Sequence, residues 1–215
     1  MNTQLYIYII TISISFALSL FLFFKSNTPL FIKGFTPFLL ISVIYEVAML
    51  YVAEKNNNTT IFYNYFTTLE ITFYLWVLLN ILKGQLVKKI IIATVIVYPI
   101  LSLIDIFFIQ KVGSFHSISY AFGCLLIVFF SILFFYQLFA KPKAIVLAKE
   151  SSFWVCTGLL LFYSVSFPLF ASVNFMTNFP AIITNNLQYV LIVLNVFLYL
   201  LFSIAFLCRI KIKKS

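Results

Sequence analysis

The chain has 215 residues, of which 64% are hydrophobic and 9% charged, and its formal net charge is +9. A soluble domain carries about 25% charged residues, and its core cannot absorb this apolar excess, whereas a lipid bilayer can because transmembrane helices satisfy their backbone polar groups internally. The basic residues fall between apolar runs rather than along one exposed face, which argues against a nucleic-acid partner and for contact with the bilayer.

Seven apolar stretches are long enough to cross a hydrocarbon core, which takes about 20 helical residues. In chain order they are 5–24, 35–53, 61–82, 90–109, 117–140, 152–173 and 184–208. The connections between them are too short to hold a folded domain outside the membrane. The sequence therefore predicts an all-α, polytopic bundle of seven transmembrane helices, with one domain over 1–208 and a basic tail over 209–215.

The distribution of Lys and Arg predicts the orientation. One set of alternate loops, taken together with the tail, holds twelve of these residues, and the other set holds only Lys55 and Lys111. Short loops rich in Lys and Arg stay in the cytoplasm. With seven spans, the N-terminus is expected outside and the C-terminus in the cytoplasm, as in a multi-pass protein of the inner (plasma) membrane.

Three ionisable residues fall inside the predicted spans, namely Glu46, Glu70 and Asp105. Each costs a few kcal/mol to insert, so each is a candidate for function. At about 1.5 Å per residue, Glu46 and Glu70 both lie about 16 Å above the inner boundary, on helices joined by a short turn. Two close carboxylates in a low dielectric cannot both stay charged, so we expect either a proton or a cation to be shared there.

Ser102, Tyr163 and Asn195 are predicted near this depth, and together with Asp105, which is predicted closer to the external face, they complete a candidate ligand- or ion-binding site. The candidate site comprises Glu46, Glu70, Tyr163, Asn195, Ser102 and Asp105. Hydroxyl and amide groups also hold membrane helices together as packing contacts, and that reading stays open for the Ser, Thr and Tyr residues. Asp105 and His116, near the external face, could equally pair with each other or be hydrated.

Several chemistries are excluded by what the sequence lacks. A single His and no H-E-x-x-H motif argue against a metal site, and the five glycines provide no G-x-S-x-G context for a serine nucleophile. The last predicted span contains no Lys for a retinal Schiff base. We therefore expect no catalytic residue, no metal, no cofactor and no enzymatic activity.

Four segments carry a resemblance to a known family: the run 153–163 (FWVCTGLLLFY), the dipeptides 45–46 and 69–70, and the run 194–199 (LNVFLY). Together they resemble a family of small seven-helix bacterial membrane proteins, and the similarity extends over most of the chain. The resemblance implies a bacterial inner membrane. Similar bundles look like input modules fused to signalling kinases, so signalling by this chain would need a separate partner protein.

Three functions are compatible with these features. The first is a non-enzymatic ligand sensor or membrane subunit with an interior polar site. The second is a proton- or cation-coupled transporter of a small solute that uses the same glutamates. The third is an effector that oligomerises and permeabilises the membrane.

Overall fold

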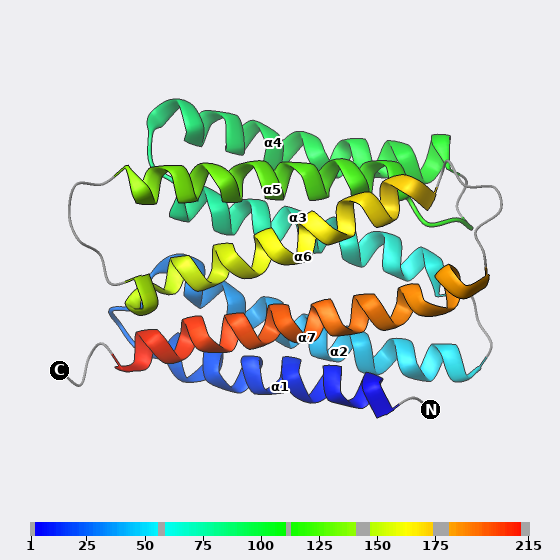
Figure 1. Cartoon of the computed structure of the whole chain (residues 1–215), viewed down its shortest axis with the longest axis horizontal. Helices are drawn as coiled ribbons and strands as arrows, with labels where there is room; N and C mark the ends of the chain where they lie inside the picture. Colours follow the sequence, from blue (N-terminus) through cyan, green and yellow to red (C-terminus); the bar gives the residue numbers. More distant parts are fainter. Residues whose placement is uncertain (1–2, 56–58, 111–112, 141–146, 174–180, 212–215) are drawn as a thin grey trace.

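The computed structural model describes residues 3–55, 59–110, 113–140, 147–173 and 181–211, with only the backbone described for 3–5, 54, 173, 181–188 and 211. This part of the chain is all-helical and has seven long helices with no strand (Figure 1). They are α1 (Thr3–Phe23), α2 (Leu30–Glu54), α3 (Thr60–Ile81), α4 (Gln85–Ile104), α5 (Ser117–Phe139), α6 (Ser151–Val173) and α7 (Ala181–Lys211). The prediction of an all-α bundle is confirmed.

Six of these helices, all except α3, are long and apolar enough to cross a membrane. The chain is therefore a multi-pass membrane protein. α3 has 22 residues, a sufficient length, but its first half carries an Asn, a Glu and three Thr, which lower its hydropathy. Asn64, Thr68 and Glu70 are buried against other helices, so most of this polarity faces protein rather than lipid.

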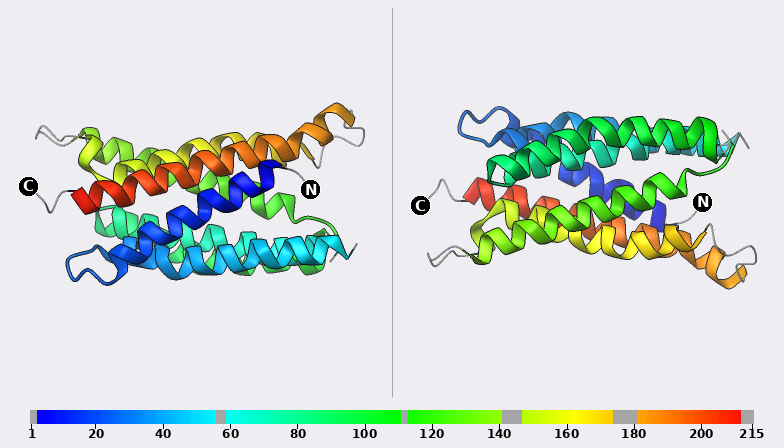
Figure 2. Two further views of the ribbon diagram at one scale, coloured as in Figure 1. Left: turned by 90° about the horizontal axis from the view of Figure 1, so that it is seen from below. Right: turned by 90° about the horizontal axis from the view of Figure 1, so that it is seen from above.

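The helices form a closed bundle in which consecutive helices are antiparallel neighbours (Figures 1 and 2). α7 packs against both α6 and α1, which closes the ring, and α3 contacts α2, α4 and α5. The α1–α7 contact is held by the Ser15 hydroxyl, which lies 2.7 Å from both the Tyr199 carbonyl and the Ser203 hydroxyl. Small polar residues of this kind allow two helices to approach closely in a membrane.

Two helices start five residues earlier than the hydropathy pattern predicts. α2 begins at Leu30 rather than at 35. Pro29 is its N-cap residue, and proline is well tolerated at the start of a helix. Pro37 lies inside α2 and does not end it. α4 begins at Gln85 rather than at 90, after Gly84, whose φ of 102° suits a residue without a Cβ. At its other end α4 continues into one π-helical turn, Asp105–Ile109.

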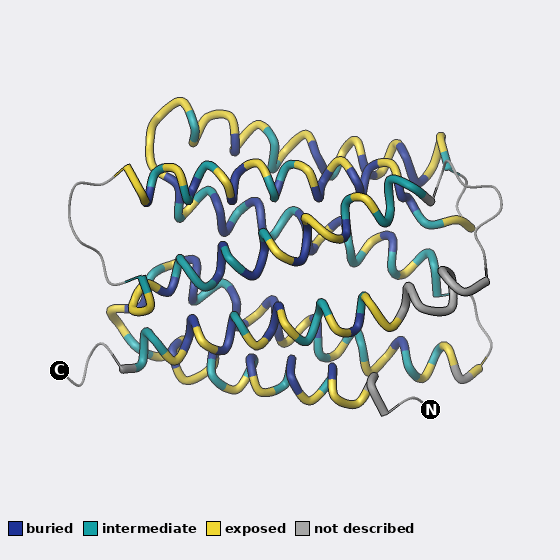
Figure 3. The backbone as a smooth tube through the Cα atoms, in the orientation of Figure 1, coloured by how far each residue is buried: buried dark blue, intermediate teal, exposed yellow. Residues whose placement is uncertain are grey.

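Burial follows one face of each helix (Figure 3). Aromatic and aliphatic side chains fill the interior, and the outward faces of the helices are rich in exposed Ile, Leu and Phe. In water such a surface would be unfavourable, whereas in lipid it needs no partner.

Basic residues gather at one end of the bundle, which we call the basic end. α1 ends there, α2 begins there, and α7 ends there (Figure 1). Eight described basic residues lie in its loops and adjoining helix turns: Lys25, Lys33, Lys83, Lys88, Lys89, Lys149, Arg209 and Lys211. At the opposite end the described chain has one, Lys55.

Candidate functional site

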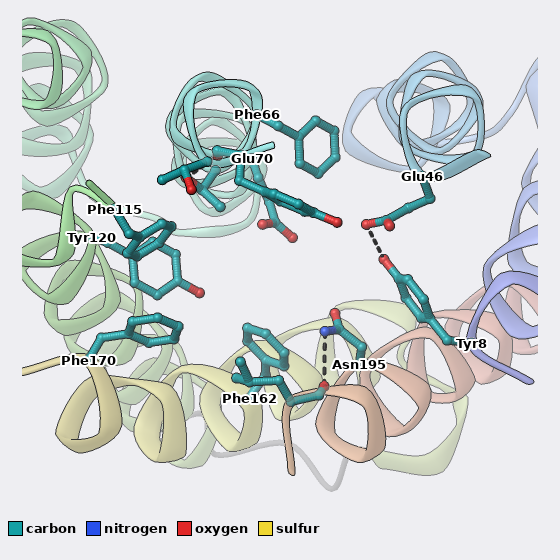
Figure 4. Close-up of a pocket in the computed structure, with 13 residues that line it drawn as sticks. Tyr8, Glu46, Phe66, Glu70, Phe115, Tyr120, Phe162, Phe170 and Asn195 are labelled. Carbon is teal, nitrogen blue, oxygen red and sulfur yellow. Dashed lines mark hydrogen bonds between the residues drawn. The ribbon is translucent and has the colours of Figure 1, made fainter. Parts of the chain in front are cut away.

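A pocket of about 310 Å³ lies within the half of the bundle opposite the basic end (Figure 4). We call it the carboxylate pocket because it contains two glutamates. Its lining residues come from α1, α2, α3, α5, α6 and α7 and from the segment before α5: Tyr8, Glu46, Thr60, Tyr63, Phe66, Thr67, Glu70, Phe115, Tyr120, Phe162, Phe170, Leu191 and Asn195. It reaches from the first residue of α3 to Glu70, roughly 15 Å deeper at the helical rise.

Glu46, on α2, is held by a neighbouring helix. The Tyr8 hydroxyl of α1 donates a 2.9 Å hydrogen bond to Glu46 Oε1 (Figure 4). Tyr8 is itself buried and its ring packs 5.8 Å from that of Tyr199 on α7. One carboxylate oxygen therefore has a fixed partner, and the other is left for a ligand or water.

Glu70, on α3, is more buried and less well satisfied. Its side chain is 7% exposed and its carboxylate points into the pocket (Figure 4). Tyr74, one helical turn further on, lies close to this carboxylate, but the Tyr74 hydroxyl has no hydrogen-bond partner among the described residues. Glu46 and Glu70 are close enough to interact electrostatically. An acidic side chain buried in this way calls for a proton or a positively charged ligand.

Asn195 completes the polar part of the lining. Its Nδ2 donates to the Leu191 carbonyl of the preceding turn at 3.0 Å, so its Oδ1 is free to face the pocket (Figure 4). The sequence places Glu46, Glu70 and Asn195 at one depth, and the structure brings all three to one pocket.

The other three candidate residues do not line this pocket. Ser102 is buried between α4 and α3, where its hydroxyl lies 2.6 Å from that of Thr68. Tyr163 is fully buried on α6 beside the ring of Tyr74, at 5.9 Å. Its hydroxyl has no hydrogen-bond partner in the described chain. Ser102 and Tyr163 are predicted near the depth of the two glutamates, but the rotation of α4 and α6 turns their side chains to other contacts.

Asp105 lies in the π-helical turn and acts on a neighbouring helix. Its Oδ2 accepts a 2.9 Å hydrogen bond from the backbone N–H of Ser119, in the first turn of α5. A carboxylate there satisfies one of the N–H groups that a helix start leaves open and interacts favourably with the helix dipole. Its other oxygen is buried with no partner among the described residues.

His116 is bonded by Asn64 rather than by Asp105. Its Nδ1 lies 2.9 Å from Asn64 Oδ1, which also accepts from the His116 backbone N–H, and its Nε2 lies 3.4 Å from the Thr67 hydroxyl. Burial lowers the pKa of His116 to about 4, and the charge of Asp105 opposes this shift. His116 is therefore neutral at neutral pH and anchors the segment before α5 to α3.

The aromatic residues of the pocket are not among the predicted site residues. Phe115, Tyr120 and Phe170 contact one another as one wall, with ring centroids 4.6 to 5.4 Å apart. Tyr8 does carry a signal in the sequence, because it lies three residues before Thr11 and so extends the polar face that Thr11, Ser15 and Ser19 form on α1. Phenylalanines carry no such signal, since 28 of them are spread along the chain.

The described residues hold no group of three or more His, Cys, Asp or Glu side chains that would ligate a metal. Comparisons with protein-family models, with curated proteins and with solved structures find no match to this chain. The resemblance to small seven-helix bacterial proteins stays a prediction from sequence. The pocket itself combines two carboxyl groups and an amide oxygen within an aromatic enclosure.

Proposed function

We propose that this chain is a non-enzymatic membrane protein that binds a small ligand in the carboxylate pocket and acts as a ligand sensor or as a binding subunit of a larger membrane complex. In this proposal all seven helices span the inner membrane of a bacterium, α3 included. The N-terminus is outside, the C-terminus is in the cytoplasm, and the output passes to a separate signalling or membrane protein.

The charge distribution supports this orientation. Eight described basic residues lie at the basic end and one at the other, which is the asymmetry expected when the basic end is cytoplasmic. The carboxylate pocket reaches the opposite end, so in this orientation its ligand enters from outside.

The observation that carries the proposal is the convergence of Glu46, Glu70 and Asn195 from three helices on one pocket, with Glu70 buried and no basic side chain among the described residues that line the pocket. Burial of an ionisable group within a membrane helix costs a few kcal/mol. A purely structural role would be expected to provide a partner that offsets this cost. Glu70 instead faces open space that a ligand can fill.

Thermal unfolding of the protein in nanodiscs tests the proposal with a panel of small solutes that includes amines, carboxylic acids and sugars. We expect at least one class to raise the unfolding temperature of the wild type and to lose this effect in the double variant Glu46→Gln, Glu70→Gln. Glu150→Gln is the matched control, because Glu150 is an exposed carboxylate outside the pocket. Equal shifts in all three proteins would rule out the site.

A coupled transporter is the second candidate, and one observation favours it. Beyond the pocket, polar groups continue between α1 and α7 toward the basic end, from Tyr8 past Tyr199 to the hydrogen-bonded pair Ser15 and Ser203. Proteoliposomes provide the test: solute uptake that follows a pH or ion gradient and is lost in the glutamate variants supports transport. Binding without uptake supports the sensor. Leakage of an enclosed dye would instead support a permeabilising effector.

A further inference from the structure

The polar atoms of the carboxylate pocket that are free for a ligand are mostly hydrogen-bond acceptors. They include the Glu70 carboxylate, the second oxygen of Glu46 and the Asn195 Oδ1. No Lys or Arg is present among the described residues that line it. A ligand that complements these groups carries positive charge and N–H donors, since an anion would meet two carboxylates and no counter-charge.

The walls of the pocket are aromatic. Seven of its thirteen lining residues are Phe or Tyr. The rings of Phe115, Tyr120 and Phe170 form one wall, and Phe66 stands beside Glu70 on α3, stacked at 4.0 Å on Tyr45 (Figure 4). Aromatic faces attract organic ammonium ions through the ring quadrupole, and this attraction grows when water is excluded.

Size separates an organic cation from a metal ion. A volume of about 310 Å³ is at the lower end for small-molecule sites, and it is far larger than an inorganic cation needs. Hard cations are bound by converging oxygen ligands at short distance, whereas here most of the lining is ring carbon. The shape suits a small apolar body that carries one charged nitrogen.

On these grounds we infer that the ligand of the carboxylate pocket is a small organic ammonium ion. Its nitrogen lies between Glu70 and Asn195, and its apolar part lies against Phe115, Tyr120 and Phe170. This inference rests on the proposed function, because it names the ligand class of that same site. The proposed function does not require that the ligand be positively charged or that aromatic rings contribute to its binding, and both are added here.

A thiol placed in the pocket can report the charge preference. Thr67 lines the pocket one turn before Glu70, and its hydroxyl bonds the Tyr63 carbonyl of its own helix, so Thr67→Cys removes no contact with another helix except the long 3.4 Å approach to His116. Of the native cysteines, Cys124 and Cys156 are buried, and Cys208→Ala removes the remaining one. The control position is Gly113→Cys, where an added Cβ meets nothing within 4 Å.

Two methanethiosulfonate reagents of similar size, one with a trimethylammonium group and one with a sulfonate, are then compared in nanodiscs, where both faces of the bilayer are accessible. Relative to Gly113→Cys, we expect Thr67→Cys to favour the cationic reagent by about tenfold or more, as charged clefts do. Adding Glu70→Gln, alone or with Glu46→Gln, is expected to remove most of this preference. The single variant serves if the double variant does not fold.

The outcomes separate the two proposals. If neither reagent reacts at Thr67→Cys while both react at Gly113→Cys, the pocket is closed to solutes and the proposed function fails together with the ligand class. If both react without preference, the pocket is open but the ammonium inference is wrong.

Protection then tests the organic class. Tetramethylammonium is expected to slow the labelling of Thr67→Cys, and Na⁺ at the same ionic strength is not. Equal protection by Na⁺ would overturn the assignment to an organic cation.

Discussion

The two halves of the bundle are built in contrasting ways, and α3 passes through both. From Ile71 to Leu78, toward the basic end, α3 presents buried apolar side chains to its neighbours. There Phe35 of α2 packs on the rings of Phe73, Phe202 and Phe206 at 4.9 to 5.5 Å. From Thr60 to Glu70 the same helix lines the carboxylate pocket.

In the interior of the packed half, aromatic rings from α2, α3 and α7 fill the space between the helices. α2 and α3 also approach closely there, because a Cβ at Gly34 would lie 2.4 Å from the Trp76 ring, beside a groove of about 630 Å³ that both residues line. In the pocket half, by contrast, rings surround open space and one carboxyl group has no neutralising partner among the described residues. We expect from this difference that the half toward the basic end supplies stability and, if the proposed function holds, that the other half gives up some stability for binding. Four measurements test this division.

The largest effect is expected from Phe35→Ala in the packed half. Removing a fully buried ring leaves a cavity and should lower the free energy of unfolding by about 3–5 kcal/mol. Phe170→Ala is the matched change in the pocket half, where the ring is half-buried and already borders open space, so less than half this loss is expected. Unfolding in mixed micelles measures both, and equal losses would contradict the division.

The next effect is a pH dependence that comes from His116. Its pKa is about 4 in the folded protein against an ordinary value of 6.5, so the unfolded chain binds more protons between these values. Stability should therefore fall as the pH is lowered from 6.5 to 4, by up to roughly 3 kcal/mol. His116→Gln should flatten the curve over this range. If His116→Gln keeps the same pH dependence of stability, that dependence comes from other titratable groups.

A smaller effect is expected at Asp105. Asp105→Ala removes the acceptor for the Ser119 N–H and should cost about 1–2 kcal/mol, as the loss of a helix cap does. Asp105→Asn keeps an acceptor oxygen and should cost less. If the two substitutions are equally destabilising in thermal unfolding, the carboxylate charge matters more than the hydrogen bond.

The smallest effect is expected at Glu70. Glu70→Gln keeps the shape of the side chain and replaces a buried ionisable group that no basic residue neutralises in the described chain, so it should change the free energy of unfolding by less than about 1 kcal/mol, in the stabilising direction. Tyr8→Phe should instead destabilise by about 1 kcal/mol, because Glu46 loses its hydrogen bond. A large loss in Glu70→Gln would make this residue structural.

Hydropathy and length predict most of the fold, because lipid enforces apolar helices of a set length. They predict that α2 starts five residues after its actual first residue, because Pro29 suggests the end of a helix but is the N-cap residue of α2. For the site, depth arithmetic groups Glu46, Glu70 and Asn195, and the structure places them in one pocket. The same arithmetic includes Ser102, which contacts Thr68 instead. Depth does not fix the rotation of a helix, and rotation depends on packing that a single sequence does not encode locally.

The contact between Ser15 and Tyr199 joins residues 184 positions apart in the chain. During synthesis α1 enters the membrane long before α7 exists, and only α2 is available to cover part of its surface. The partners of the Ser15 hydroxyl on α7, the Tyr199 carbonyl and the Ser203 hydroxyl, are synthesised only after five further helices. Assembly of this protein therefore ends when α7 packs against α1 and closes the bundle. If translation stalls before α7 is made, the polar face of α1 around Ser15 stays uncovered, and this exposed face is a target for membrane quality control.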